Sequence, residues 1–262
     1  MLFRSEVVAL AGKVTTPDPV YLLGGPMMGR FGSDSEPVTK TSSAVIVLPA
    51  DHSLYFKKTA RFKNSVARAA SSCCQCQTCT DLCPRHLLGH PIEPHLFMRS
   101  AANQDTQNLA PFLNTYFCSS CGLCEMYSCP QGLNPRSMIG EYKGGLRKAG
   151  VKAPAVEAKT PNADRDFRKV SEERLTARLG LTRYNLSAPL DDQLRSCARC
   201  KVMLSQHIGA PAIAAVSVGD HVRCGDLLAK AAEGLSVNIH APMDGRVTEV
   251  ADRYIMVEKE DV

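Results

Sequence analysis

The chain of 262 residues contains no tryptophan, and aromatic residues make up only 6% of it. With so few large aromatic side chains, we expect modest hydrophobic cores in two or three small domains. Long hydrophobic runs are also missing. The longest, at residues 44–48, is typical of a buried strand and falls far short of the ~20 apolar residues that a membrane-spanning helix needs. The sequence therefore predicts a soluble or peripheral protein.

Cysteines are abundant by contrast: there are twelve, and eight of them form two runs that each end in Cys-Pro. The runs are Cys73-x2-Cys76-x2-Cys79-x3-Cys83-Pro84 and Cys118-x2-Cys121-x2-Cys124-x4-Cys129-Pro130. The first has, at every position, the spacing with which bacterial ferredoxins bind [4Fe–4S] clusters, and the second has one extra residue before its last cysteine. Because soft thiolates suit iron–sulfur chemistry, the runs predict two clusters and a one-electron relay.

The last cysteine of each run is predicted to serve the other cluster, as is usual in two-cluster proteins. One cluster then takes Cys73, Cys76, Cys79 and Cys129. The other takes Cys118, Cys121, Cys124 and Cys83. This crossed pairing joins the two halves of the segment and keeps the clusters close enough for electron exchange. The prolines fix φ where the chain leaves each cluster.

Other uses of the cysteines are less consistent with the spacing. Structural zinc sites usually pair two CxxC knuckles across a longer gap, and disulfides need an oxidising compartment, whereas no signal peptide precedes the runs. Cys74 is predicted to be a bystander thiol, with replacement of Cys73 as a ligand as the alternative. Cys197-x2-Cys200 and Cys224 are predicted to be incidental thiols, with a third metal site as the alternative.

The net charge is +5, and basic residues gather just before the first run. They are Lys57, Lys58, Arg61, Lys63 and Arg68. We predict that they form the solvated face of a helix; the alternatives are docking of an acidic redox partner and neutralisation of the clusters' negative charge. No motif or aromatic interleaving indicates nucleic-acid binding.

The first half of the chain is predicted to change from strands to helices. Strands at 20–23 and 44–48 flank the loop Gly24-Gly25-Pro26-Met27-Met28-Gly29, where the backbone must turn sharply. Helices are predicted at 91–102, opened by Pro91, and at 107–117. Asn134 and Pro135 predict the N-cap and first turn of a helix that runs to Lys148 and ends at Gly150.

Residues 150–170 predict a linker, and a short amphipathic helix follows at 172–179. The tail predicts the strands of a small barrel-like sandwich at 216–220, 222–228, 237–240, 245–250 and 254–257. Its pieces Val218-Gly219-Asp220-His221-Val222 and Ala241-Pro242-Met243-Asp244-Gly245-Arg246-Val247 resemble biotinyl and lipoyl carrier domains. Such carriers attach their arm to a lysine seven residues before the Ala-Pro pair, where this chain has Gly234, and Lys230 comes four residues too early. The resemblance therefore implies the carrier fold without its swinging arm.

Three motifs in three segments together resemble one family. The loop of residues 24–29 is similar to the glycine loop of the soluble-ligand-binding β-grasp (SLBB) domain in Rnf complex C subunits and in PduS-like cobalamin reductases of propanediol-utilisation microcompartments. The spacing Cys124-x4-Cys129-Pro130 resembles the cobalamin reductases in particular. Ser205-Gln206-His207-Ile208-Gly209-Ala210-Pro211-Ala212 resembles the opening of the barrel-sandwich domain that both groups carry. Here that domain follows the cysteines, as in the PduS-like proteins, whereas in Rnf C subunits it comes first.

The resemblance implies an α+β multidomain fold in four parts. They are a partial SLBB β-grasp segment at 1–50, an α-helical ferredoxin-type domain with two [4Fe–4S] clusters at 51–149, a linker with a short helix at 150–200 and an unmodified barrel-sandwich hybrid domain at 201–262. Full-length relatives begin with a Rossmann-like domain that holds FMN and accepts hydride from NADH, and no segment here resembles it. We therefore expect the electron-relaying part of a reductase, either a fragment or one component of a split protein, with no catalytic acid, base or nucleophile.

The implied function is that of an NADH-dependent, cobalamin reductase-like oxidoreductase, in which electrons pass from a reduced flavin through the two clusters to a corrinoid. Expected partners are a flavin- and NADH-binding domain or subunit and a corrinoid-handling protein of the adenosyltransferase type, or another redox protein. The expected location is the cytoplasm, either free or inside a bacterial microcompartment. His207 and His221 are predicted to be ordinary polar residues, with cobalt coordination as the alternative. Two rival functions are an Rnf-type electron-transfer subunit that reduces a protein partner, and a non-redox scaffold stapled by clusters or zinc.

Overall fold

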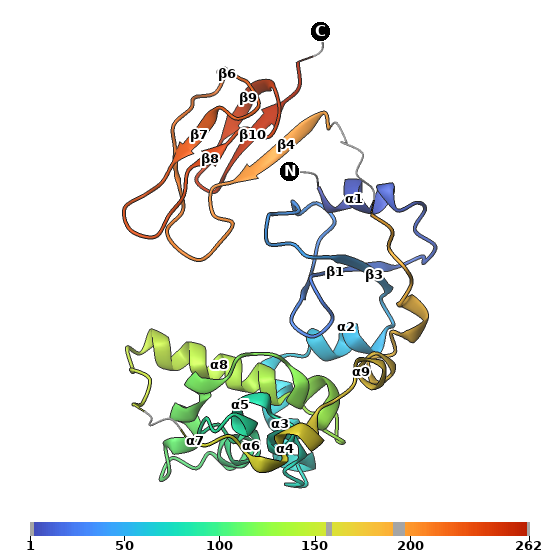
Figure 1. Ribbon diagram of the computed structural model, residues 1–262, viewed down its shortest axis with the longest axis vertical. Helices are drawn as coiled ribbons and strands as arrows, with labels where there is room; N and C mark the ends of the chain where they lie inside the picture. Colours follow the sequence, from blue (N-terminus) through green and yellow to red (C-terminus); the bar gives the residue numbers. More distant parts are fainter. Residues whose placement is uncertain (1–2, 156–158, 191–196, 261–262) are drawn as a thin grey trace. The chain divides into compact units, whose positions relative to one another are not determined.

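The computed structural model describes residues 3–155, 159–190 and 197–260, and it divides into two compact units (Figure 1). The β unit comprises Met1–Gly24, Arg30–Ala50 and Ala188–Val262. The helical unit comprises Gly25–Gly29 and Asp51–Ser187. The chain therefore contributes to the helical unit twice, first with part of the glycine loop and then with the long segment that carries both cysteine runs. None of the helices in the described ranges is long and apolar enough to cross a membrane.

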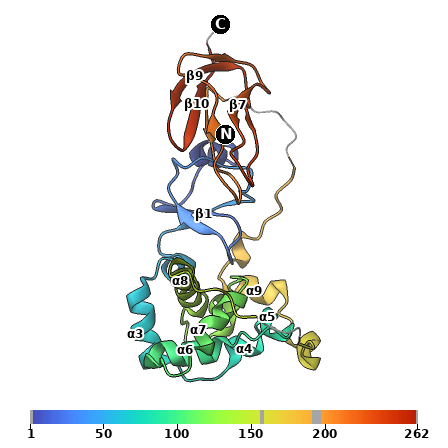
Figure 2. The same ribbon diagram turned by 90° about the vertical axis from the view of Figure 1, so that its left-hand side faces the viewer.

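The helical unit consists of short helices joined by tight turns (Figure 2). Its α-helices are α2 (Ser53–Lys58), α3 (Phe62–Ser72), α4 (Thr78–Asp81), α5 (Pro84–Leu87), α6 (Pro94–Asn103), α7 (Ala110–Leu113), α8 (Pro135–Lys148) and α9 (Glu172–Arg178). The other helical turns are η1 (Asn114–Phe117), η2 (Cys124–Ser128), η3 (Ala163–Arg168) and η4 (Thr182–Tyr184); η2 is a π-helix and the rest are 3₁₀-helices.

The core of the helical unit lies between α3, α6, α7 and α8. Phe97 from α6 and Met138 from α8 are no more than 1% exposed. Phe97 also belongs to an aromatic cluster with Phe112 and Tyr142. The centre of the Tyr142 ring lies 5.2 Å from that of Phe97, in an edge-on arrangement, and 5.3 Å from that of Phe112, in a stacked arrangement. Met138 and Tyr142 stand one helical turn apart, so α8 presents one apolar face to this core.

Two predicted helices of the helical unit, α8 and α9, are confirmed, and one begins elsewhere. α8 has the predicted bounds, with Pro135 in its first turn and Gly150 at φ 73° just after it. The helix predicted at 107–117 is divided into α7 and η1. The start predicted at Pro91 is wrong: α6 begins at Pro94, because Ile92 is held in a turn, where its N–H donates to the carbonyl oxygen of His90.

The described residues of the β unit form three small sheets. In the N-terminal sheet, β1 (Pro19–Leu23) pairs antiparallel with both β2 (Arg30–Gly32) and β3 (Val45–Pro49). The C-terminal part has a four-stranded sheet and a three-stranded sheet around a single apolar core. The first is ordered β4 (Arg199–Met203), β10 (Tyr254–Glu258), β9 (Gly245–Val250), β6 (His221–Val222); the second is ordered β5 (Ile213–Ala214), β7 (Leu227–Lys230), β8 (Ile239–His240).

Two predicted strands of the tail are wrong, and both are interrupted by aspartate turns. Residues 217–220 form a turn in which Asp220 Oδ2 accepts from the backbone N–H of Ser217 at 2.8 Å. The strand predicted at 222–228 is split into β6 and β7, because Asp226 Oδ2 accepts from the N–H of Arg223 at 2.7 Å. Short aspartate side chains compete with strand pairing by binding the backbone nearby. β9 and β10 agree with the predicted strands.

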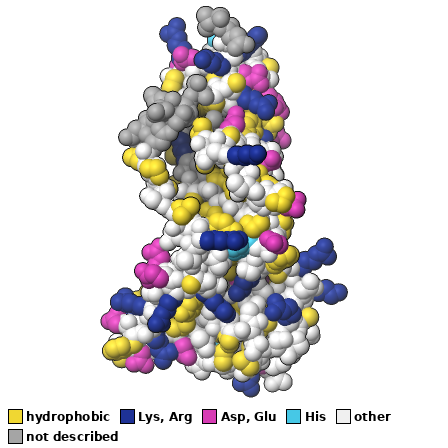
Figure 3. Space-filling model, turned by 90° about the vertical axis from the view of Figure 1, so that its right-hand side faces the viewer, with side chains coloured by type: hydrophobic (Ala, Val, Ile, Leu, Met, Phe, Trp, Pro, Cys, Tyr) yellow, Lys and Arg dark blue, Asp and Glu magenta, His cyan; other side chains and the backbone are white. Residues whose placement is uncertain are grey.

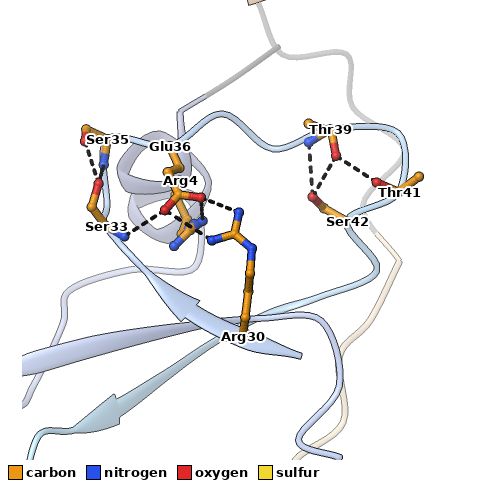
Figure 4. A network of polar contacts seen from close by, with 8 residues as sticks. All are labelled: Arg4, Arg30, Ser33, Ser35, Glu36, Thr39, Thr41 and Ser42. Carbon is orange, nitrogen blue, oxygen red and sulfur yellow. Dashed lines mark hydrogen bonds and ion pairs between the residues drawn. The ribbon is translucent and has the colours of Figure 1, made fainter. Parts of the chain in front are cut away.

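An ion-pair network around the buried Arg4 supports the N-terminal sheet (Figure 4). Arg4, the first residue of α1 (Arg4–Leu10), is fully buried and lies 2.9 Å from the Glu36 carboxylate. Arg30 lies 2.6 Å from the same oxygen, and the N–H of Ser33 donates to the other carboxylate oxygen at 3.2 Å. A Cβ atom at Gly32 would lie 2.4 Å from Glu36 Oε1, so a larger residue there would displace this carboxylate from the network.

Candidate iron–sulfur sites

The first cysteine run curls around a cavity in the helical unit. Cys73 ends α3, Cys76 lies in the following loop and Cys79 lies in α4. Cys129, the last cysteine of the second run, completes the set. These four cysteines line one cavity, which we call the first cavity. Cys74 also lines it, and its role remains a prediction.

The second run forms a matching cavity in the same unit. Cys118 follows η1, Cys121 lies in the next loop and Cys124 begins η2. Cys83, from the end of the first run, lies against them. These four cysteines line another cavity, which we call the second cavity. The structure thus brings together, in two separate sets, the same eight cysteines that the spacing assigned to two clusters.

Left-handed residues explain why both loops curl. In the first run Gln75 and Gln77 have φ values of 54° and 64°. In the second run the corresponding positions, one before and one after the middle cysteine, are Ser120 at 59° and Gly122 at 83°. Positive φ is costly for residues with a side chain, so its recurrence at matched positions marks a conformation that the site requires.

The extra residue of the second run is absorbed by its π-helix. In the first run, the ordinary α-helical turn of α4 leads from Cys79 towards Cys83. In the second run η2 spans Cys124–Ser128, and Ser128 Oγ donates to the carbonyl oxygen of Leu123 at 3.1 Å. A π-turn holds about one residue more than an α-turn. Cys129 therefore reaches the first cavity despite the longer spacing.

Burial and crowding keep the inner thiols protonated. Burial, followed by the neighbouring sulfurs of Cys129, Cys76 and Cys73, raises the pKa of Cys79 to about 12. Burial also raises the pKa values of Cys83 and Cys124. Helix α4, which carries Cys79, packs against η2, which begins at Cys124, so the two cavities are neighbours. Metal ligation requires thiolates, so loading either site must release protons.

Hydrogen-bond donors already point at several sulfurs. Around the first cavity, Gln75 Nε2 lies 3.3 Å from Cys73 Sγ, Thr78 Oγ1 lies 3.4 Å from Cys76 Sγ, and the N–H of Leu133 lies 3.3 Å from Cys129 Sγ. The Thr78 contact lowers the pKa of Cys76. At the second cavity the N–H of Ser120 lies 3.3 Å from Cys118 Sγ. Such donors stabilise thiolate charge and tune iron–sulfur potentials.

Positive charge is concentrated at the second cavity. Arg85 and Arg136 line it, and Arg85 Nε donates to the Phe117 carbonyl oxygen at 3.2 Å. Lys143 Nζ donates to the carbonyl oxygen of Cys118 at 2.8 Å. Other Lys and Arg side chains project separately over this unit, the lower part of Figure 3. The positive charge at the second cavity would compensate the negative charge that four thiolates bring.

The basic segment before the first run forms the predicted solvated helix face only in part: Arg61, Lys63 and Arg68 are exposed in or just before α3. It is divided between α2 and α3, and Lys57 and Lys58 are half-buried. Lys58 Nζ donates to the carbonyl oxygens of Met27 at 3.1 Å and Gly29 at 2.7 Å. Burial, followed by the charge of Arg136, lowers the pKa of Lys58 to about 8.

The bonds from Lys58 anchor the glycine loop on the helical unit. Within the loop, the N–H of Gly29 donates to the carbonyl oxygen of Gly25 at 2.7 Å. A Cβ atom at Gly122, which lines the second cavity, would lie 3.1 Å from the carbonyl oxygen of Met27. The glycine loop therefore contacts the wall of the second cavity, a contact that sequence reasoning missed.

Glu125 links the second cysteine run to α8, and sequence reasoning missed it as well. The residue is 1% exposed and follows Cys124 in η2. Its carboxylate accepts from Ser137 N at 2.8 Å and Ser137 Oγ at 3.0 Å, in the first turn of α8. Asn134, predicted as the N-cap, makes no side-chain cap; its Nδ2 donates to the carbonyl oxygen of Lys57 at 3.2 Å. Glu125 therefore caps the N-terminus of α8.

The histidines make ordinary structural contacts. These are His86 with the Ile92 carbonyl oxygen at 3.1 Å, His95 with Thr80 at 2.8 Å, His207 with the Ile208 carbonyl oxygen at 2.9 Å and His221 with Glu260 at 3.1 Å. Across the described residues, no three His, Cys, Asp or Glu side chains form a group that could hold a single metal ion.

Comparison with known protein families agrees with this geometry. The family described as "4Fe-4S dicluster domain" matches residues 72–134, which include all eight cysteines. The family described as "RnfC Barrel sandwich hybrid domain" matches residues 189–261. The fold and site define an iron–sulfur protein that combines a 4Fe–4S dicluster domain with an RnfC-type barrel-sandwich domain.

The chain is also similar to two curated proteins over nearly its whole length. It is 38% identical over 256 residues to Cobalamin reductase PduS of Salmonella typhimurium strain LT2, and 35% identical over 254 residues to Cobalamin reductase PduS of Citrobacter freundii. Both alignments cover 96% of this chain. The chain spans about half the length of these relatives, 56% in each case. The predicted resemblance to PduS-like proteins is confirmed.

Proposed function

We propose that the chain is an iron–sulfur electron carrier with one [4Fe–4S] cluster in each cavity. The crossing of the cysteines is the observation that carries the proposal, because each cavity has three cysteines from one run and the last cysteine of the other. A [4Fe–4S] cluster takes up and releases one electron at a time and needs four thiolates, one for each iron. The cysteine sets match that demand in number and kind.

The remaining residues support this use of the cavities. Ile92 and Ile139 help line the second cavity, and Met98 and Leu133 help line the first, so apolar groups exclude water beside the sulfurs. Low polarity and hydrogen bonds to sulfur are the means by which proteins set the potential of such sites. The two cavities are also neighbours through the packing of α4 against η2, which favours electron exchange between them.

The similarity to PduS supports a corrinoid as the final electron acceptor, and we propose cobalamin reductase-like activity for the assembled system. The electrons would come from NADH through FMN on a separate domain or subunit. The corrinoid would be free or held by a handling protein of the adenosyltransferase type, in the cytoplasm or a propanediol-utilisation microcompartment. We further propose that the β2-β1-β3 sheet belongs to an SLBB β-grasp domain, and that the barrel-sandwich domain, with Gly234 in the β7–β8 hairpin, is unmodified.

The first test is the iron and acid-labile sulfide content of anaerobically purified protein. We expect about eight of each per chain, four for each cavity. Cys121→Ala should lose about half of both, because it removes a ligand of one cluster only. Cys73→Ala should do the same, whereas its neighbour Cys74→Ala is the matched control that retains both clusters. Zinc without sulfide would contradict the proposal.

The second test concerns the acceptor. Chemically reduced protein should reduce hydroxocobalamin, which is followed by its visible spectrum, and Cys121→Ala should lose most of this rate. The RnfC-type domain favours a second candidate, an electron carrier that reduces a protein partner. Fully loaded, reducible protein that leaves hydroxocobalamin unchanged would favour that candidate over the corrinoid.

A further inference from the structure

A pair of cysteines in the barrel-sandwich domain lies outside both cavities. Cys197 Sγ and Cys200 Sγ are 3.0 Å apart. Cys200 is 3% exposed on β4, where it pairs with Val257 of β10, and Cys197 is half-buried just before the strand. Between them, the carbonyl oxygen of Ala198 accepts from the N–H of Lys259 at 2.8 Å. Both cysteines are thus held by the sheet rather than by a free tail.

The pair is not arranged as a metal site. The nearest further sulfur is Met243 Sδ, 3.6 Å from Cys197 Sγ, and a thioether is a weak ligand for zinc. Cys224 is exposed, and the N–H of its backbone bonds Asp244 at 2.6 Å. No third His, Cys, Asp or Glu joins the pair among the residues that the structure describes. Two facing thiols remain, without a ligand set.

We propose that Cys197 and Cys200 form a reversible dithiol–disulfide site, a redox modification site distinct from the cluster cysteines. Closing the bond needs the sulfurs to approach from 3.0 Å to the ~2.05 Å of a disulfide, a shift that side-chain rotation can supply. Cys197 is half-buried, so its thiolate can attack a disulfide from solution and form a mixed disulfide with it. The buried Cys200 then attacks Cys197 Sγ and closes the bond within the protein.

The oxidant is a low-molecular-weight disulfide, for which oxidised glutathione is the probe. The Cys197 thiolate attacks one sulfur of the probe, forms a mixed disulfide and releases one glutathione thiolate. Cys200 loses its proton and attacks Cys197 Sγ, which breaks the mixed disulfide and releases the second glutathione. The protein gives up two electrons and two protons, and one oxidised glutathione becomes two reduced molecules. Burial, followed by the contact with Cys200, raises the pKa of Cys197 to about 11, so this reaction is expected to be slow at neutral pH.

The test uses the anaerobically purified, iron-loaded chain equilibrated in glutathione buffers. Free thiols are then alkylated, and the peptides are examined by mass spectrometry while the visible spectrum reports the clusters. We expect the peptide with Cys197 and Cys200 to lose two hydrogens and to carry no label. Diluting total glutathione tenfold at a fixed oxidised-to-reduced ratio should raise the disulfide-to-dithiol ratio about tenfold, because two thiols are released per bond.

Two variants and one internal control sharpen the result. Cys197→Ser and Cys200→Ser should each leave a single thiol that forms only a mixed disulfide, and its occupancy should not change on that dilution. Cys224, exposed and alone, should behave in the same way in the unaltered chain. Complete alkylation of both cysteines in every buffer would overturn the proposal, and so would a bond from either of them to Cys224. The wild-type measurement decides the matter even if a serine variant fails to fold.

Discussion

Glu125 offers the sharpest test of how the helical unit holds its cysteines in place. Its carboxylate is 1% exposed and accepts two hydrogen bonds from Ser137 at the start of α8. It also acts on Lys57 and Lys58, whose pKa values are lowered mainly by burial and are partly restored by its negative charge. We therefore expect Glu125→Gln, which keeps the shape and removes the charge, to destabilise the unit.

The magnitude follows from three contributions. A hydrogen bond to a charged group is worth about 1.5–3 kcal/mol, against roughly 0.5–1.5 kcal/mol for a neutral one. The favourable interaction between a negative charge and a helix N-terminus adds about 0.3–1 kcal/mol and rises to about 2 kcal/mol where it is partly buried. Relief of the cost of burying the carboxylate offsets part of this. We expect a net loss of about 2 kcal/mol for Glu125→Gln and about 3 kcal/mol for Glu125→Ala.

The assay is anaerobic thermal unfolding of the iron-loaded chain, at one scan rate because cluster loss makes unfolding irreversible. About 2 kcal/mol should lower the midpoint by roughly 6–8 °C in a unit of this size. Ser137→Ala should cost about 1 kcal/mol, and the double variant should be less destabilised than the sum by about 0.5–1 kcal/mol. Glu141→Gln, an exposed change on α8, is the control and should stay within about 0.5 kcal/mol of wild type. An unchanged midpoint in Glu125→Gln, or strict additivity with Ser137→Ala, would refute the capping role.

Two further predictions concern buried charges elsewhere. Glu36→Gln leaves the fully buried Arg4 without its ion-pair partner and should destabilise the β unit by about 3 kcal/mol, whereas Arg30→Gln, at an exposed site, should cost less than about 1 kcal/mol. Hydrogen bonding to Arg30, with smaller contributions from Ser33 and Arg4, lowers the pKa of Glu36 from 4.5. The stabilisation from these contacts together is therefore present above 4.5 and is lost as pH falls through the lower folded value, and acid unfolding of Glu36→Gln should lack that dependence. Lys58→Met should raise amide hydrogen exchange at Gly29 about tenfold, because the bonds that hold the glycine loop are lost, while Lys63→Met on exposed α3 should leave it unchanged. Equal exchange in the two variants would contradict the anchoring.

Features set by local spacing could be predicted from the sequence. The bounds of α8 follow from Pro135 and Gly150. The division of the eight cysteines between the two cavities follows from the spacing within each run, where three cysteines lie close together and the fourth lies a little farther along the chain. β9 and β10 likewise follow from apolar alternation between turn residues. In each case the deciding residues lie within a few positions of one another.

Features set by contacts across the sequence could not be predicted in this way. Lys58 looks like one more basic residue of a helix, and only the fold brings the carbonyl oxygens of Met27 and Gly29 to its ammonium group. Arg4 is an apparent surface residue until Glu36 lies beside it. Cys200 looks like half of an isolated CxxC until β4 pairs with β10. A charged or polar residue is buried only when its partner comes too, and the partner is invisible in a local window.

The two cysteine runs share one capping contact, although the residues that make it differ. In each run the residue after the third cysteine is buried and binds the backbone at the start of the next long helix: Thr80 Oγ1 accepts from His95 N at 3.0 Å in α6, as Glu125 does from Ser137 N in α8. Both helices carry proline in the first turn, where its missing N–H costs nothing. A hydroxyl is enough in the α-turn of α4, whereas the longer π-turn of η2 carries a carboxylate with greater reach. The extra residue of the second run thus changes the capping group and leaves the crossed arrangement of the cysteines intact.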